Sequence, residues 1–250
     1  MIFLTSPAKS LNKNKKHSNI QTTQPLFLKY AIQIIDILRG YSAAQLEKKL
    51  GISPKLSLIN FERYQRWTTN HTGDNSNPSL FLFYGHVFQQ LHPETYTLDE
   101  QVYAQSSLRI LSGLYGLLRP YDLIQPYRLE MGTNNLSSSM PSLVSFWKTR
   151  VSHAIAQEAR EHEYIINLAS QEYSQVIDIT ALPCPMITIQ FKENKGGVLK
   201  TIGIPSKIAR GMMIEFCIKN RIQSLDDIKK FSLGGYSFYN DSGDTLTFIR

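Results

Sequence analysis

Apolar residues along the chain recur either at a spacing typical of strands or at a spacing typical of helices. The first six residues, MIFLTS, form an apolar run that predicts a buried strand. Residues 26–39 predict an amphipathic helix that ends at Gly40. Its expected apolar face consists of Leu28, Ile32, Ile35 and Leu38. A short helix is predicted from Ser42 to Gly51, and Ser53-Pro54 opens another, whose apolar positions include Leu56, Ile59 and Phe61.

The remaining patterns mix the two kinds of element. Strands are predicted at 79–88, where Gly85 interrupts the run, at 163–170, in a hairpin that turns at 194–197, and in a final pair that turns at 241–243. Helices are predicted at 98–111, 142–162 and 206–221. Because no regular βαβ rhythm appears, the pattern favours one domain over residues 1–250, of the α/β class in its mixed α+β form, with helices flanking the sheet.

Composition narrows the class of protein. The 250 residues are 42% hydrophobic, which is enough for a sizeable core, and no run is long enough for a membrane span or has the form of a signal peptide. Cys184 and Cys217 lack the spacing of a zinc or disulfide site, so we expect free thiols, no metal site and a reducing cytoplasm. The net charge of +7 favours polyanionic ligands, although it would also aid solubility.

The segment LSGLYGLLRPYDLIQPYRLEMG, residues 111–132, concentrates glycine, proline, tyrosine and arginine. Residues 105–118 can form a helix that the glycines weaken and Pro120 stops. Arg119 and Arg128 flank this bend and would clamp phosphate oxygens, and three tyrosines could stack on bases or sugars: Tyr115, Tyr121 and Tyr127. The alternative is a tightly packed corner in which the arginines pair with Glu130 or Asp122.

Two polar loops follow predicted strands, where sites in α/β proteins collect. In SPAK, Ser6 offers a hydroxyl and Lys9 a charge for a phosphate or carboxylate, at the start of a basic loop that also holds Lys13, Lys15 and Lys16. A solvated loop is the alternative. In NLASQEY, the candidates are Asn167, Ser170, Glu172 and Tyr173. Glu172 would be a general base or a partner for a lysine, and a helix cap is the alternative.

The helix predicted at 206–221 carries Lys207 and Arg210 on one face. The adjoining Gly211 permits close approach to a partner. Most of this helix is expected to be core, and these two cations are the exceptions.

These motifs together resemble the YaaA peroxide-stress proteins. The resemblance rests on SPAKSL, the segment 111–132, FW at 146–147, NLASQEY and the KIARGMM helix, in that order over the whole chain. It implies a cytoplasmic bacterial protein that is made during hydrogen peroxide stress and limits damage linked to intracellular iron. It also implies a mixed α/β domain with a positively charged cleft and a helix–hairpin–helix-like element, here at 108–123, which binds duplex and branched DNA.

Candidate residues carry over from the family by position. They are Ser6, Lys9, Arg119, Arg128, Glu130, Asn167, Ser170, Glu172, Tyr173, Lys207 and Arg210. The chain departs from the family pattern at 83–91, where Tyr84 and His86 stand in place of the usual lysine and aspartate. His86 is more often structural than a metal ligand when no other histidine accompanies it.

Two hypotheses follow for the function. The first is a monomeric DNA-binding protein that reads little sequence, needs no cofactor and gathers Lys9, Arg128 and Arg210 in one groove. The second is an enzyme that acts on a nucleotide or another small anion in the same pocket, with Glu130 or Glu172 as acid or base. Direct iron binding is a weaker third idea, because the histidines show no ligand spacing.

Overall fold

The computed structural model describes residues 1–12 and 20–250, so Lys13, Lys15 and Lys16 of the predicted basic loop lie outside the described residues. The α-helices are α1 (Leu28–Arg39), α2 (Ala43–Leu50), α3 (Pro54–Arg66), α4 (Ser79–Leu82), α5 (Leu98–Ser107), α6 (Leu143–Glu158), α7 (Gln171–Ser174), α8 (Gly203–Asn220) and α9 (Leu225–Lys229). Short 3₁₀ helices are η1 (Phe88–Gln90), η2 (Pro93–Thr95), η3 (Ala159–Glu161) and η4 (Ile179–Ala181). In the described part of the chain, no helix is long and apolar enough to span a membrane.

The strands are β1 (Ile2–Thr5), β2 (Asn77–Pro78), β3 (Leu108–Ser112), β4 (Gly116–Leu118), β5 (Leu123–Ile124), β6 (Asn134–Ser137), β7 (Met140–Ser142), β8 (Ile165–Asn167), β9 (Met186–Lys195), β10 (Val198–Lys200), β11 (Ser237–Asp241) and β12 (Thr245–Ile249). Within the described residues, eight of them form one sheet in the order β11-β12-β9-β8-β1-β3-β4, with β10 paired to β9. Its centre is parallel, and β4, β10 and β11 pair antiparallel. The predicted mixed α/β fold is therefore confirmed.

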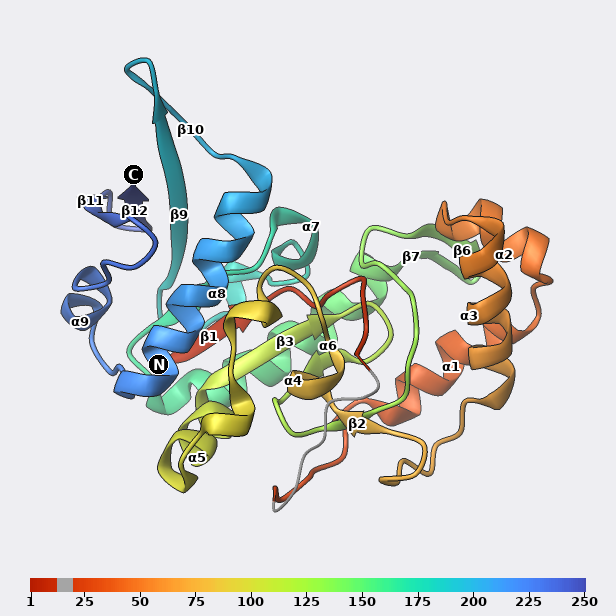
Figure 1. The fold of residues 1–250 in the computed structure, drawn as a ribbon. Helices are drawn as coiled ribbons and strands as arrows, with labels where there is room; N and C mark the ends of the chain where they lie inside the picture. The colour runs from red at the N-terminus through yellow and green to blue at the C-terminus, as the bar shows by residue number, and fades with distance from the viewer. Residues whose placement is uncertain (13–19) are drawn as a thin grey trace.

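The elements spread along the sheet between two ends of the molecule (Figure 1). Helices α1, α2 and α3 gather at one end, and β9, β11, β12 and α9 lie at the other, from which the β9–β10 hairpin projects. Helix α8 contacts β9, α5 contacts β1 and β3, and α6 contacts β4. The core between them is rich in large side chains, such as Phe3, Trp147, Phe191 and Phe248.

The parallel centre of the sheet determines where a site can form. β1 pairs with β3 on one side and with β8 on the other, with Leu4 opposite both Arg109 and Asn167. The carboxyl ends of β1 and β8 therefore meet at one edge, and the loops that follow them leave the sheet side by side. Such a point, where the chain continues to opposite sides of a central strand, is where α/β folds bind ligands.

Three local predictions were wrong. Residues 79–88 form the turn of α4 and a loop rather than a strand, and only Phe83 makes an isolated bridge, to Leu11. The predicted helix at 98–111 ends at Ser107, and residues 108–118 form the β3–β4 hairpin. A helix–hairpin–helix element is therefore absent from residues 108–123, all of which are described, because this apolar stretch pairs with β1 in the sheet.

Candidate functional site

A cavity of about 370 Å³ lies where the loops after β1 and β8 meet α8. Its lining comes from four segments that are distant in the sequence: residues 6–10, residues 84–89, residues 168–173 and helix α8. Seven of the predicted site residues line it: Ser6, Lys9, Ser170, Glu172, Tyr173, Lys207 and Arg210. This volume lies within the range of ordinary small-molecule sites.

Ser6 and Ser170 join the two strand-end loops. The backbone N–H of Ser170 donates to Ser6 Oγ at 2.9 Å, and the two hydroxyl oxygens are 3.2 Å apart. Asn167 stabilises this turn, because its Oδ1 accepts a hydrogen bond from the N–H of Ala169 at 3.0 Å. Asn167 is itself buried and does not line the cavity, so its position favours an orienting role rather than direct contact with a ligand.

Helix α8 supplies Lys207 and Arg210 to the cavity wall. Within residues 1–12 and 20–250, neither side chain has a hydrogen-bond or ion-pair partner, and Arg210 Nε is buried. Burial lowers the pKa of Arg210, as expected for a cation that has lost water without gaining an acceptor. Among the described residues that line the cavity, the Arg210 guanidinium is therefore the group that an anionic ligand would stabilise most.

Gly211, the residue after Arg210, allows helix α8 to approach the opposite wall closely. A Cβ at this position would lie 2.3 Å from the carbonyl oxygen of Val87 and 2.9 Å from Gln90 Cβ. The close approach predicted for Gly211 is thus made within the molecule, to the segment 84–90. Gly85 makes a similar contact, since its Cβ would lie 3.0 Å from Ala8 Cβ.

The wall formed by residues 84–89 was not predicted as part of the site. Tyr84 donates its backbone N–H to Ser10 O at 2.9 Å, which attaches this wall to the loop after β1. Tyr84 and His86, the two departures from the family pattern, both line the cavity and are exposed. The only sequence signal was the glycine that interrupts an apolar run, which indicates close backbone approach.

Glu130 connects Lys9 with Arg128. Lys9 Nζ lies 2.8 Å from Glu130 Oε2, and Arg128 donates to Glu130 Oε1 at 2.6 Å. Burial alone would raise the pKa of Glu130, but the hydrogen bonds from Lys9 and Arg128 outweigh it and hold the pKa below its ordinary value. Lys9 and Arg210 both line the cavity, and Arg128 is connected to Lys9 through Glu130 but does not line the cavity itself.

Glu172 lines the cavity and accepts the N–H of Gly132 at Oε1, at 3.2 Å. Its neighbour Tyr173 is mostly buried, and burial raises the pKa of its phenol, so the hydroxyl stays protonated at neutral pH. Glu172 and Tyr173 both line the cavity, on the turn of α7 that follows Ser170.

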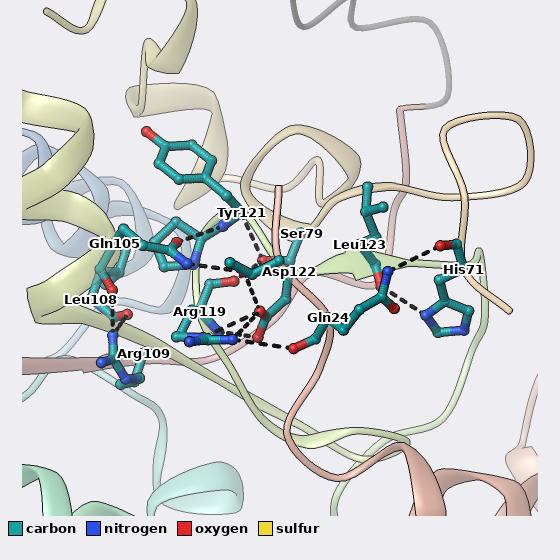
Figure 2. A network of polar contacts seen from close by, with 12 residues as sticks. Gln24, His71, Ser79, Gln105, Leu108, Arg109, Arg119, Tyr121, Asp122 and Leu123 are labelled. Carbon is teal, nitrogen blue, oxygen red and sulfur yellow. Dashed lines mark hydrogen bonds and ion pairs between the residues drawn. The ribbon is translucent and has the colours of Figure 1, made fainter. Parts of the chain in front are cut away.

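Arg119 lies in a different network (Figure 2). Its guanidinium contacts Asp122 Oδ1 at 3.1 Å and the carbonyl oxygen of Gln24 at 3.2 Å. Asp122 also accepts from Thr23 Oγ1 at 2.6 Å. Burial raises the pKa of Asp122, and the hydrogen bonds from Arg119 and Thr23 oppose this rise. Arg119 does not line the cavity. Together, Arg119 and Asp122 connect residues 23–24 to the chain after β4.

The glycines and tyrosines of residues 111–132 are packing residues. Tyr115, Tyr121 and Tyr127 are 0%, 3% and 5% exposed, so the expectation that they stack on a ligand is wrong. Trp67 Nε1 donates to Tyr115 Oη at 2.9 Å, and a Cβ on Gly116, which has φ +70°, would meet the Trp147 ring at 2.6 Å. The tightly packed corner is the alternative that the structure supports.

Across the described ranges, no group of three histidine, cysteine or carboxylate side chains is placed to hold a metal.

Comparison with known proteins identifies relatives over the full length. A family model described as "Peroxide stress protein YaaA" matches residues 1–242. A UPF0246 protein of Legionella pneumophila is 44% identical over 255 residues, which cover 100% of this chain and 99% of the relative. UPF0246 proteins of Francisella tularensis and Flavobacterium johnsoniae are 42% and 40% identical, with 100% of both chains covered in each case.

Proposed function

Since the chain belongs to the YaaA family of peroxide stress proteins, we propose that it acts in the response to hydrogen peroxide by binding phosphate groups at this cavity. DNA, duplex or branched, is the phosphate-bearing ligand that we favour, bound with little regard to base sequence. In this proposal the protein is a cytoplasmic monomer that binds DNA during hydrogen peroxide stress and limits iron-linked oxidative damage.

One observation carries the proposal: Arg210 faces the cavity with a buried Nε that has no acceptor among the described residues. A buried donor without a partner costs on the order of 1–3 kcal/mol, and more when it is charged. A phosphate oxygen would remove this cost and would form a charge-assisted hydrogen bond. Lys207, one helical turn earlier, adds a second charge to the same space.

The distribution of charge supports a polyanion as the ligand. The chain carries a net charge of +7, and the Lys9 side chain remains 63% exposed beside the cavity despite its ion pair. Contacts of lysine and arginine with phosphates supply affinity without reading bases, which accounts for the expected indifference to sequence. Arg128 is shielded by Glu130, so Lys207 and Arg210 are expected to contribute most.

Salt-dependent titration tests DNA binding. We expect affinity for duplex and four-way-junction DNA to fall steeply between about 50 and 200 mM salt. The double variant Lys207→Ala, Arg210→Ala should reduce the slope of log K against log salt by about two. The matched control is Lys55→Ala, Arg66→Ala, which removes the same charge from α3. Equal losses in the two double variants would show that only net charge matters and would refute binding at this cavity.

Glu172 gives a specific reason to keep a second candidate, an enzyme that acts on a small phosphate-bearing substrate. Its carboxylate lines the cavity that holds Arg210, so an acid or base and an anion-binding group share one space. Incubation with a panel of nucleotides and sugar phosphates, followed by chromatography, tests this candidate. Turnover that disappears in Glu172→Gln would support it, since glutamine can still accept from the Gly132 N–H. Intact substrates would dismiss it.

A further inference from the structure

Tyr84 presents an aromatic ring to the cavity that the core does not cover. It lines the cavity and is 44% exposed, whereas Phe88 and Tyr173, the other six-membered rings in the described lining, are 3% and 7% exposed. Its backbone is fixed by the hydrogen bond from its N–H to Ser10 O at 2.9 Å. An exposed ring on a fixed backbone offers a flat apolar face to a ligand at little entropic cost.

The ring and the unpaired cation line the same cavity from two elements that are in contact, the segment 84–89 and helix α8. Tyr84 begins this wall beside the loop after β1. Val87, one turn later, contacts α8 at Gly211, directly beside Arg210. The turn between them is closed by the N–H of Gln89, which donates to Gly85 O at 2.9 Å. A ligand that reaches both groups must therefore carry a planar apolar part at one end and an anion at the other.

Polar groups in the same lining suit a sugar. The Ser6 and Ser170 hydroxyls lie 3.2 Å apart, and Glu172 adds a carboxylate to the same lining. Hydroxyl and carboxylate groups of this kind bind sugar hydroxyls. The volume of about 370 Å³ is at the lower end of the range of small-molecule sites. The cavity has room for one ligand of moderate size, so a DNA ligand would place only one phosphate-bearing unit in it.

We infer that the cavity binds a single nucleotide unit, with the base on the ring of Tyr84 and the phosphate at Arg210 and Lys207. The inference rests on the proposed phosphate site and adds recognition of the base. The nucleotide is either free or one unit of a DNA strand, since base and phosphate would be recognised in the same way, although an internal unit of a DNA strand has no free sugar hydroxyl for Ser6, Ser170 or Glu172. Stacking on an aromatic side chain tolerates every base, so little base preference is expected.

Calorimetric titration with adenosine 5′-monophosphate, ribose 5-phosphate and inorganic phosphate tests this assignment. We expect the nucleotide to bind about tenfold or more tightly than ribose 5-phosphate, because a base stacked on an aromatic ring adds affinity of this order. Tyr84→Leu should remove this difference and leave ribose 5-phosphate binding unchanged. Tyr239→Leu, at a tyrosine of β11 that is 57% exposed, is the matched control and should change nothing.

The variants separate this inference from the proposed phosphate site. Arg210→Ala should weaken the nucleotide and ribose 5-phosphate alike, and melting curves of each variant verify folding. If the two ligands bind wild type equally, or if Tyr84→Leu leaves the difference intact, base recognition is overturned while phosphate binding stands. If Arg210→Ala changes neither ligand, the phosphate site itself is overturned. Competition by a single-stranded oligonucleotide would identify a DNA strand as the source of the unit, and its failure to compete would identify the free nucleotide.

Discussion

The Lys9 ammonium lies 2.8 Å from the carboxylate of Glu130, which also accepts from Arg128 at 2.6 Å. One carboxylate thus holds the loop after β1 to the segment that follows β5. The arrangement explains why an acidic residue accompanies two of the predicted phosphate-binding cations. Glu130 fixes where they stand, whereas Lys207 and Arg210 have no ion-pair partner among the described residues.

Replacing Glu130 with glutamine should destabilise the protein at neutral pH. Arg128 and Glu130 have side chains that are 18% and 24% exposed, so removing the negative charge leaves a poorly hydrated guanidinium. We expect a loss of about 1–2 kcal/mol in the free energy of unfolding, less than for a fully buried pair. Urea unfolding monitored by fluorescence measures it. An unchanged midpoint and slope would mean that the ion pairs contribute no net stability.

The same pair of proteins should respond differently to acid. The folded-state pKa of Glu130 is lowered, so its contribution is complete above the unfolded value of about 4.3 and is lost as pH falls through the folded value. The stability difference between wild type and Glu130→Gln should therefore shrink below about pH 4.3. A difference that stays constant down to pH 3 would contradict the lowered pKa.

Gly211→Ala should disturb both stability and the cavity. The added Cβ would meet the Val87 carbonyl oxygen at 2.3 Å, and backbone cannot turn away as a flexible side chain can. Helix α8 must then shift from the wall that carries Tyr84, so we expect a loss of about 2 kcal/mol or more together with weaker phosphate binding.

Gly203→Ala is the control in the same helix. Nothing lies within 4 Å of its Cβ position, so the substitution should be neutral or stabilise the helix by about 0.5 kcal/mol. Thermal unfolding and phosphate titration of both variants provide the comparison. Equal stabilities of the Gly211→Ala and Gly203→Ala proteins would show that the contact with Val87 is not tight.

Sequence patterns identified elements whose ends are marked by local chemistry. Ser42 and Gln45 form a capping box at the start of α2, and Gly51 ends it with φ +59°. Ser53 caps α3 and Pro54 is its first residue, as predicted. Such signals depend on a few neighbouring residues, so they can be recognised in the sequence without knowledge of the tertiary structure.

Patterns failed where tertiary contacts decide the structure. The apolar positions expected on α3 include Leu56, which is 39% exposed, while the helix buries Ser57, Asn60 and Tyr64. Asn60 is accommodated because its side-chain amide donates to the Leu56 carbonyl oxygen at 2.8 Å. The spacing of apolar residues does not indicate in advance that a buried polar side chain will find a hydrogen-bond acceptor in its own helix.

The candidate site was predictable in part. Ser6 and Ser170 follow strands that turn out to be parallel neighbours, so the rule that sites lie at strand ends located two of the four lining segments. The separation of Arg119 from Arg128 was not predictable, because both flank one short segment. Their distinct surroundings arise from the β3–β4 hairpin, which the helical interpretation of this stretch missed.

Arg119→Met should lower stability without changing affinity for phosphate. It leaves the carboxylate of Asp122, which is 1% exposed, without its cationic partner. We expect a loss of about 2 kcal/mol at neutral pH, since Arg119 itself is partly exposed and the pair is not fully desolvated. The double variant with Asp122→Asn should recover part of this loss, which a double-mutant cycle measures.

The destabilisation by this variant should shrink in acid, as that by Glu130→Gln does, although the pKa of Asp122 is raised and that of Glu130 is lowered. Burial already raises the pKa of Asp122, and loss of Arg119 removes one of the contacts that oppose the rise. An acid with a raised folded pKa stabilises the folded state below its unfolded pKa and loses this contribution as pH rises through the folded value. The destabilisation by Arg119→Met should therefore be larger at pH 7 than at pH 4. Weaker phosphate binding at unchanged stability would instead assign Arg119 to the ligand site.

Neither cysteine should act as a rapid peroxide sensor, although the family is linked to peroxide stress. Burial raises the pKa of Cys217, which is 1% exposed, and burial also raises the pKa of Cys184 more than the nearby N-terminal amine lowers it. The thiolate is the nucleophile that attacks the O–O bond of peroxide, so both side chains should react slowly at neutral pH. Intact-mass analysis after peroxide and dimedone treatment should show unmodified native protein, while alkylation in guanidinium chloride should label both thiols. A sulfenic acid at Cys184 that forms within minutes at micromolar peroxide would contradict this prediction, and Cys184→Ser would then identify its source.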